Sequence, residues 1–455
     1  MAGLFAISVD PKIAAENFLE DLFWGTFYQQ HWGEEYTGLA IFANGRQEQI
    51  AVRTHRGLFR PTFGNDMVGL EGTAGIGYCG SAREPYLIRS RLGELCLCFS
   101  GNLVNRKELI GEFMNAGQVF ARGDDIEVIS KLLVQGDNVI EGIRNVDKKI
   151  KGAYSLLILS REGIYAARCP AGYWPLVVGH KDGAAAVASG STGFDNLGFE
   201  PERDIAPGEI VLLQGGSFWS KDLRPAEIIQ ECSFCWFYTD FATSVLNGIS
   251  VSAVRKRSGA ALARRDIEAG FIPDIVSPIP DSGKHHALGY HQEFCRQITQ
   301  GKVTRVPLYD ELLSKYPYAG RSFTPIRSED RQLEGKIKQL PSGESYQGKK
   351  AAIIDDSIVR GTQTCQDLVP KLRATGVTEI HLRISNPPLL SPCPWGKTTN
   401  RKNELFAFRF PEIKKRVEFL KVESLMYNTT DDIAAAIGLP SEQLCIDCSL
   451  SKPLA

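Results

Sequence analysis

The chain has 455 residues, enough for two or more domains with hydrophobic cores of their own. Its 52 Lys and Arg residues balance 53 Asp and Glu residues, and the net charge of −1 excludes a general attraction to nucleic acid or to a membrane surface. The 11 cysteines, an odd number spread over a long chain, argue against a secreted disulfide scaffold. Because the first residues lack the pattern of a signal peptide and no apolar run is of membrane-spanning length, we expect a cytoplasmic protein.

The first half of the chain contains short runs of alternating hydrophobicity separated by Gly-rich turns. Residues 40–54 and residues 154–169 each have the pattern of two strands joined by a turn. Such hairpins predict an antiparallel α+β domain, which we assign to residues 1–230.

The pattern changes at about Asp274 to a repeating order of apolar run, loop and helix. Residues 274–294 and 351–372 show this order, and residues 378–385 add a further apolar run. The alternation predicts βαβ units and a parallel sheet in a second domain, residues 231–455.

The most informative motif spans residues 351–364. A short apolar run ends in Asp355 and Asp356, and a Gly/Thr turn leads directly into a helical pattern. A buried parallel strand presents binding residues at its carboxyl end. The loop through Gly361 can turn backbone N–H groups toward a phosphate, while the carboxylates can bind sugar hydroxyls or Mg²⁺. We therefore predict a site for a phosphorylated sugar rather than a plain strand with an acidic edge.

A second loop of the same kind, Asp281-Ser282-Gly283, follows an earlier apolar run. Its backbone N–H groups can meet another anionic group. Alone this tripeptide would be an ordinary turn, but the pairing with the first loop favours a shared site. The adjacent His285 and His286 would point to different faces of a helix, and we expect them to be solvated rather than bound to a metal.

Residues 351–364 closely resemble the phosphoribosyl-diphosphate (PRPP) signature of the type I phosphoribosyltransferases. The Ser-Ile-Val-Arg-Gly-Thr continuation resembles the glutamine PRPP amidotransferase, or amidophosphoribosyltransferase, family. The resemblance implies an N-terminal-nucleophile-hydrolase-like glutaminase domain followed by an α/β type I phosphoribosyltransferase domain. It also implies a purine-synthesis enzyme that transfers an amine to PRPP, giving phosphoribosylamine and pyrophosphate. The residues it places at PRPP are Asp281, Ser282, Gly283, Arg321, Arg331, Lys338, Asp355, Asp356, Ser357, Arg360, Gly361, Thr362 and Gln363, and those it places at Mg²⁺ are Ser282, Asp355 and Asp356.

The basic segment 308–340 resembles the family's mobile loop, which folds over PRPP. Cations there would neutralise the departing pyrophosphate, although a solvated charged hairpin is the alternative. The sequence departs from the family at residues 240–243, where Arg-Pro-Asp is missing, and at Thr398, where an acidic residue is missing. Both departures concern the ammonia channel or the fine specificity.

Four of the cysteines match positions at which some members of the family bind a [4Fe–4S] cluster. They are Cys232, Cys393, Cys445 and Cys448, and the last two form a CxxC pair in the C-terminal tail. Soft thiolates suit an iron–sulfur cluster or zinc. We expect a structural [4Fe–4S] cluster, with zinc or unliganded thiols as the alternatives.

The first domain lacks the residues on which glutamine hydrolysis depends in the family. Ala2 stands at the position of the nucleophilic cysteine, Gly80 at that of the arginine that holds the substrate carboxylate, and Ser100 at that of an oxyanion-hole asparagine. Gly101, Asn102 and the glutamine-binding acid Asp125 are retained. We expect no catalytic residue and no glutaminase activity in this half.

Two cysteines lie close to these altered positions and require separate consideration. Cys79 or Cys98 would be a poor replacement nucleophile without an N-terminal amine as base, and buried structural thiols are the expectation.

Three functions remain open. The first is transfer of ammonia, free or from a separate glutaminase, to PRPP. The others are regulation of a functional homologue by a non-catalytic PRPP- or nucleotide-binding paralogue, and phosphoribosyl transfer to another nucleophile. The resemblance also implies a homo-oligomer.

Overall fold

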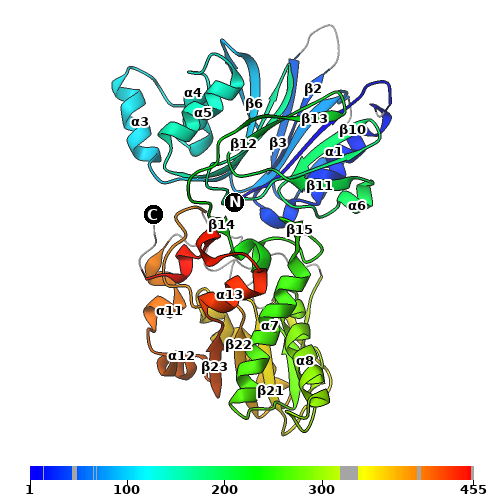
Figure 1. Ribbon diagram of the computed structural model, residues 1–455, viewed down its shortest axis with the longest axis vertical. Helices are drawn as coiled ribbons and strands as arrows, with labels where there is room; N and C mark the ends of the chain where they lie inside the picture. Colours follow the sequence, from blue (N-terminus) through cyan, green and yellow to red (C-terminus); the bar gives the residue numbers. More distant parts are fainter. Residues whose placement is uncertain are drawn as a thin grey trace. The chain divides into compact units, whose positions relative to one another are not determined.

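The computed structural model describes residues 1–13, 15–43, 49–64, 66–67, 69–317, 337–396 and 401–451. The chain divides into two compact units (Figure 1). The first runs from Met1 to Cys232 and includes Thr243–Gly248 and a short segment that starts at Pro394. The second contains the rest of the chain from Ser233 onward.

Two antiparallel sheets form the first unit. The two predicted hairpins are present as β2–β3 and β7–β8, and the facing sides of the sheets are lined with buried apolar residues. The seven-stranded sheet has the order β11 (Glu200–Asp204), β9 (Val177–Lys181), β10 (Ala184–Ala188), β1 (Gly3–Val9), β4 (Ala74–Gly80), β2 (Tyr36–Ala43), β3 (Gln49–Arg56). The six-stranded sheet has the order β13 (Ser217–Leu223), β12 (Glu209–Gln214), β8 (Gly163–Arg168), β7 (Gly152–Ser160), β6 (Gly93–Leu103), β5 (Tyr86–Ser90).

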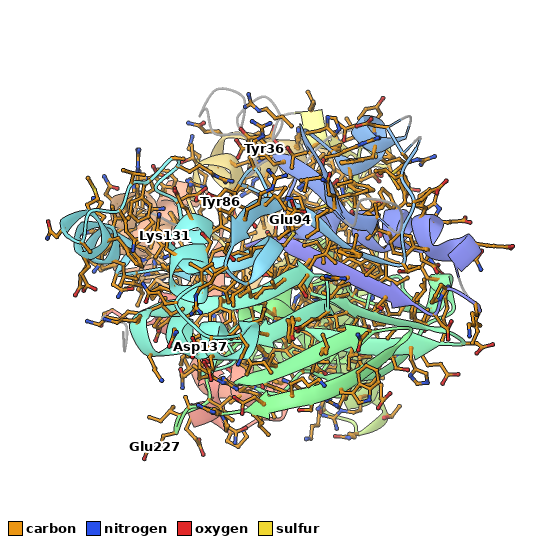
Figure 2. The ribbon with its side chains drawn as sticks, turned by 90° about the horizontal axis from the view of Figure 1, so that it is seen from above. Tyr36, Tyr86, Glu94, Lys131, Asp137 and Glu227 are labelled. Carbon is orange, nitrogen blue, oxygen red and sulfur yellow. The ribbon has the colours of Figure 1, made fainter. Side chains whose placement is uncertain are left out.

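Helices cover the outer faces of these sheets. Helix α1 (Phe18–Phe27) packs on β1 and β4, and α4 (Asp125–Leu133) packs on β5 and β6. Figure 2 shows Lys131 of α4 on the same side of the unit as Tyr86 of β5. Side-chain caps begin α4 and α5 (Val139–Lys149), because Asp124 and Asn138 each accept a backbone N–H of the first turn. The remaining helices are α2 (Phe59–Phe63), α3 (Arg106–Asn115) and α6 (Phe194–Leu197).

A five-stranded parallel sheet forms the centre of the second unit. Its order is β18 (Leu308–Tyr309), β17 (Ile275–Pro278), β21 (Lys350–Asp355), β22 (Glu379–Ile384), β23 (Ser424–Tyr427). Buried residues alternate along β21, with Ile353 packing on one face and Ile354 on the other, as a sheet covered on both sides requires. This architecture confirms the predicted fold class.

Helices pack against both faces of this sheet. Helices α7 (Val251–Glu268) and α8 (Lys284–Thr299) pack against each other and cover one face. Residues of α10 (Val369–Ala374) and α12 (Ile413–Leu420) contribute to the apolar cluster on the other face. Helices α11 (Phe406–Arg409) and α13 (Thr430–Ile437) and the antiparallel pair β19 (Leu313–Lys315) and β20 (Gln339–Pro341) complete the described part.

A buried ion pair joins the helical layer to the sheet. The guanidinium of Arg383 on β22 donates to both carboxylate oxygens of Asp266 on α7, at 2.6 and 2.8 Å, and both side chains are 5% exposed. Tyr290 on α8 donates its hydroxyl to the same carboxylate at 2.6 Å. Three elements therefore meet in one hydrogen-bonded group. Among the described residues, no helix combines the length and apolarity that a membrane span would need.

Candidate active site

The two predicted anion-binding loops meet at the carboxyl edge of the parallel sheet. Asp281–Gly283 follows β17, and Asp355–Gly361 ends β21 and leads into a helix that starts at Thr362. Strands β17 and β21 are neighbours, so their carboxyl ends lie together. The Ser282 hydroxyl donates to Asp355 Oδ1 at 3.1 Å and joins the two loops directly.

The carboxylates of Asp355 and Asp356 are adjacent, and their negative charges repel each other. Asp356 is 3% exposed, and burial raises its pKa despite hydrogen bonds from serine hydroxyls. Burial and the charge of Asp356 raise the pKa of Asp355 well above its usual range. A divalent cation would relieve this repulsion, and Mg²⁺ commonly binds through one or two carboxylates together with substrate phosphates. The donor set therefore fits Mg²⁺.

Two lysines surround the carboxylate of Asp281. Lys315 on β19 donates to Asp281 Oδ2 at 2.9 Å, and Lys284 lies 3.6 Å from Oδ1 and 3.1 Å from Glu311. Burial acts to raise the pKa of Asp281, but the lysines outweigh it and lower that pKa. Gly283 has no room for a side chain, because an added Cβ would lie 2.9 Å from Ile279 N and O and would also overlap the Ile354 carbonyl. The loop thus combines a close backbone turn with positive charge.

The loop after the carboxylates is fixed to the segment that contains α11. Gly361 has a φ of +73°, and an added Cβ would lie 2.6 Å from the Phe406 ring. The Phe406 N–H donates to Val359 O at 2.8 Å. Arg360 Nε donates to Glu404 Oε2 at 2.8 Å. The family resemblance implied a substrate contact for Arg360, and no sequence motif indicated its pairing with Glu404.

The other residues predicted to bind PRPP differ in exposure and in contacts, and some lie outside the described residues. Thr362 is partly exposed and Gln363 is exposed at the start of the helix, and Ser357 donates its hydroxyl to Asp356 Oδ2 at 2.5 Å. The backbone carbonyl of Lys338 accepts the Tyr316 N–H at 2.7 Å beside the β19–β20 pair. Arg321 and Arg331 lie outside the described residues, as does Thr398.

Arg255 is a buried arginine near the carboxylates that the sequence did not indicate. Arg255 on α7 is 5% exposed and donates to the carbonyls of Trp236 and Asp240, at 2.9 and 2.7 Å. Burial lowers the pKa of Arg255, and the negative charges of Asp356 and Asp240 oppose that effect. Its position in the basic run 255–257 gave no sign that it would be buried.

The expectation that both adjacent histidines are solvated was wrong for His286. The ring is fully buried, its Nε2 lies 3.2 Å from Phe237 O, and it stacks on the Phe237 ring with centroids 5.8 Å apart. Burial lowers the pKa of His286 to about 3, so the ring is neutral. It packs the start of α8 against residues 235–239.

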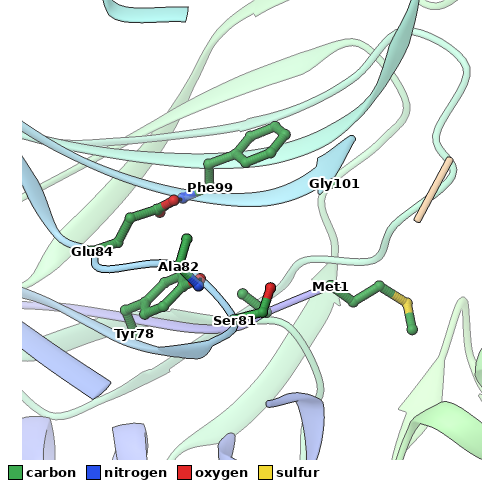
Figure 3. A pocket seen from close by; sticks show the side chains of 8 residues that line it. Met1, Tyr78, Ser81, Ala82, Glu84, Phe99 and Gly101 are labelled. Atoms are coloured by element: carbon green, nitrogen blue, oxygen red, sulfur yellow. Dashed lines mark hydrogen bonds between the residues drawn. The ribbon is translucent and has the colours of Figure 1, made fainter. Parts of the chain in front are cut away.

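A small hollow lies beside Ala2 in the first unit. Ala2 is 2% exposed, and its N–H donates to Ser100 Oγ at 2.9 Å. Figure 3 shows the hollow, where the buried Glu84 carboxylate lies against the backbone of Phe99 and accepts its N–H at 2.7 Å. The cavity volume that a water molecule can occupy is about 10 Å³, on the order of one water.

The positions next to this hollow are packed in a way that excludes larger groups. A Cβ at Gly80 would overlap the Tyr78 phenol and lie 2.7 Å from the Ala2 Cβ. Tyr78 Oη in turn accepts the Ala82 N–H at 3.1 Å. The retained Asp125 pairs with Arg106 at 3.2 Å. The side chain of Asn102 donates to Pro394 O at 2.8 Å.

The two thiols near this hollow are enclosed by the fold. Cys79 and Cys98 are fully buried. Burial raises the pKa of Cys79, and burial with the charge of Glu84 raises that of Cys98. Both thiols therefore stay protonated at neutral pH, as expected for structural cysteines.

Backbone hydrogen bonds connect the C-terminal tail, which contains Cys445 and Cys448, to residues 390–391 and to Ser233 of the second unit. The carbonyl of Cys448 accepts the N–H groups of Leu390 and Ser391, at 2.8 and 3.1 Å, close in sequence to Cys393. The carbonyl of Cys445 accepts both the N–H and the hydroxyl of Ser233. Within the described ranges, no three His, Cys, Asp or Glu side chains are arranged to hold a metal ion.

Comparison with known proteins agrees with this arrangement of domains. A family model described as a glutamine amidotransferase domain matches residues 79–196. The chain is 34% identical to an amidophosphoribosyltransferase of Methanocaldococcus jannaschii, covering 99% of this chain and 97% of the relative. It is 31% identical to the amidophosphoribosyltransferase of Bacillus subtilis over 89% of this chain and 85% of the relative.

A solved structure matches over nearly the whole chain. The glutamine PRPP amidotransferase from B. subtilis, complexed with ADP and GMP, has a TM-score of 0.85 and 27% identity, covering 99% of this chain and 97% of that one. The extent of these similarities places the chain in the amidophosphoribosyltransferase family.

Proposed function

We propose that this protein transfers ammonia to PRPP, giving phosphoribosylamine and pyrophosphate, and that it does not hydrolyse glutamine itself. The observation that carries the proposal is the hydrogen bond from Ser282 to Asp355, which unites the two anion-binding loops in one site. The family relationship supports the same reaction as a step of purine synthesis.

Some residues of the second unit would bind PRPP and Mg²⁺, and others would stabilise the negative charge of pyrophosphate. Asp355 and Asp356 would hold the ribose hydroxyls and Mg²⁺, and the loop through Gly361 would hold the 5′-phosphate. Bound Mg²⁺ would neutralise charge on the pyrophosphate. Asp281–Gly283, with Lys284 and Lys315 beside it, would bind the pyrophosphate.

In the reaction, the ammonia lone pair forms the new C–N bond at C1 of the ribose. The C1–oxygen bond breaks, and its electron pair leaves with pyrophosphate. The nitrogen then loses one proton to solvent. Arg321, Arg331 and Lys338 would cover the site and exclude water from the cationic sugar.

The small hollow beside Ala2 supports the absence of glutaminase activity. The nucleophile position offers a methyl group, a side chain at position 80 would overlap Tyr78, and the space left is about 10 Å³. Ammonia would therefore come from solution or from a separate glutaminase.

The experiment is a comparison of nitrogen donors. Purified protein with PRPP and Mg²⁺ should release pyrophosphate with ammonium chloride and not with glutamine. Formation of glutamate from glutamine would refute the inactive-glutaminase proposal. Binding of PRPP without release at saturating ammonium would instead identify a regulatory paralogue, and release only with another amine would identify a different nucleophile.

For the cysteines we propose a [4Fe–4S] cluster on Cys232, Cys393, Cys445 and Cys448. The support is the CxxC pair and the backbone bonds between the tail and the segment before Cys393. The described side chains are not grouped around a common metal position, so a bound cluster would have to draw the four thiolates together. Thiolate ligands of this kind suit iron–sulfur or zinc. Analysis of iron, acid-labile sulfide and zinc in anaerobically purified protein distinguishes the two, and protein without iron would refute the cluster.

A further inference from the structure

The buried carboxamide of Asn386 has no hydrogen-bond acceptor for its nitrogen among the described residues. Asn386 is 3% exposed, and no acceptor lies within range of Nδ2. An unsatisfied buried polar group costs about 1–3 kcal/mol, so it calls for an explanation. By contrast, the buried Asn428 donates through Nδ2 to the carbonyls of Ser258 and Ser385 at 3.1 Å and accepts from Arg265 at 2.7 Å.

Asn386 lies at the same sheet edge as the carboxylate pair. It follows β22, the strand next to β21, and its N–H donates to Asp356 O at 2.8 Å. Ser385 directly precedes it, is fully buried, and has no partner for its hydroxyl in the described part of the chain. Two unsatisfied polar groups are therefore adjacent beside the predicted sugar site.

The strand order places Asn386 on the side of the carboxylates away from the loop predicted to bind pyrophosphate. The order is β17, β21, β22, so Asp281–Gly283 and Asn386 flank the carboxylates Asp355 and Asp356 on opposite sides. Pyrophosphate held at the β17 loop occupies one side of C1. A group that displaces pyrophosphate approaches C1 from the opposite face, and Asn386 is a buried polar residue on the β22 side of the carboxylates that could meet it.

We propose that the Asn386 carboxamide binds the incoming amine on the face of the sugar opposite to the pyrophosphate. The proposal rests on the proposed function. Oδ1 would accept an N–H of ammonia and leave its lone pair free for C1, while Nδ2 would donate to an oxygen of the bound sugar phosphate. The nitrogen loses its proton to solvent after the C–N bond has formed, and the C–O electron pair leaves with pyrophosphate.

The test is steady-state pyrophosphate release at varied ammonium and varied PRPP. Asn386→Leu keeps a side chain of similar size and removes both polar atoms, and Asn386→Ser is a smaller replacement should the first fail to fold. We expect the KM for ammonium to rise about tenfold, because the variant loses one or two hydrogen bonds to the amine. The KM for PRPP should change little. Asn428→Leu is the matched control, which should lower the melting temperature without a selective change in the KM for ammonium.

The outcomes separate this inference from the proposed function. A folded Asn386 variant with an unchanged KM for ammonium, or with only the KM for PRPP raised, overturns it. Wild-type protein that releases no pyrophosphate with ammonium refutes the proposed function and this inference together.

Discussion

The ion pair between Arg360 and Glu404 offers a direct test of how the phosphate loop is held. The side chains are 37% and 32% exposed and lie 2.8 Å apart. A pair of this exposure contributes about 0.2–1 kcal/mol to stability. Since the Phe406 N–H bond to Val359 and the contact of Phe406 with Gly361 remain, the loop would loosen without unfolding.

We therefore expect Glu404→Gln and Arg360→Met to lower the melting temperature by no more than about 4 °C. Each should reduce kcat/KM for PRPP about tenfold, equivalent to about 1.4 kcal/mol. The exchanged pair Arg360→Glu with Glu404→Arg should recover most of the loss. Pyrophosphate release at limiting PRPP, with thermal unfolding in parallel, measures both effects.

The pair Arg373–Glu423 is a closely matched control in the same unit. Its side chains are 33% and 37% exposed, and its shortest distance is also 2.8 Å. Glu423 also accepts the Ile380 N–H at 2.6 Å, so Glu423→Gln should cost at least as much stability and leave the kinetics with PRPP unchanged. If Arg360→Met is damaging while Glu404→Gln is neutral, Arg360 acts on the substrate directly and the positioning argument is refuted.

Three further predictions follow from the buried groups. The raised pKa values of the carboxylate pair favour protonation in the folded protein, so ionisation costs stability as pH rises above the unfolded value near 4. Mg²⁺ should accordingly raise the melting temperature more at about pH 8 than at about pH 5, and Asp356→Asn should abolish this difference and reduce turnover by about 100-fold or more. Iodoacetamide should modify the exposed Cys295 in folded protein but reach Cys79 only in urea, as peptide mass analysis can show; prompt alkylation of Cys79 would contradict its burial. Arg383→Met should cost about 3–5 kcal/mol in urea unfolding because Asp266 keeps a buried charge. Adding Asp266→Asn, which removes the charge and keeps an acceptor for the Tyr290 hydroxyl, should restore most of it; a single variant of normal stability would refute that account.

The sequence was most informative where the chemistry depends on neighbouring residues in one segment. The carboxylates at the end of an apolar run predicted both β21 and its loop. The family resemblance placed Ser282 and Asp355 at the same Mg²⁺, and the hydrogen bond between them brings these residues together. Arg321 and Arg331 stay predictions, because they lie outside the described residues.

Local spacing did not identify residues whose roles depend on distant packing. His286 is buried by Phe237, 49 positions earlier in the chain, and Glu404 pairs with Arg360 across 44 positions. Arg255 reads as one of several basic residues on α7, yet its partners are backbone carbonyls of residues 236 and 240. A helix pattern shows which residues share a face but not which segment covers that face.

The residues around Ala2 in the first unit form one packed arrangement. Tyr78 occupies the space that a side chain at position 80 would need, and Ala2 lies close enough that the same side chain would also crowd it. Glu84 is held in the hollow by the Phe99 N–H. A cysteine placed at position 2 would therefore meet a hollow of about 10 Å³. Because the contacts between β1, β4 and β6 hold these side chains in place, we expect Ala2→Cys alone not to create glutaminase activity.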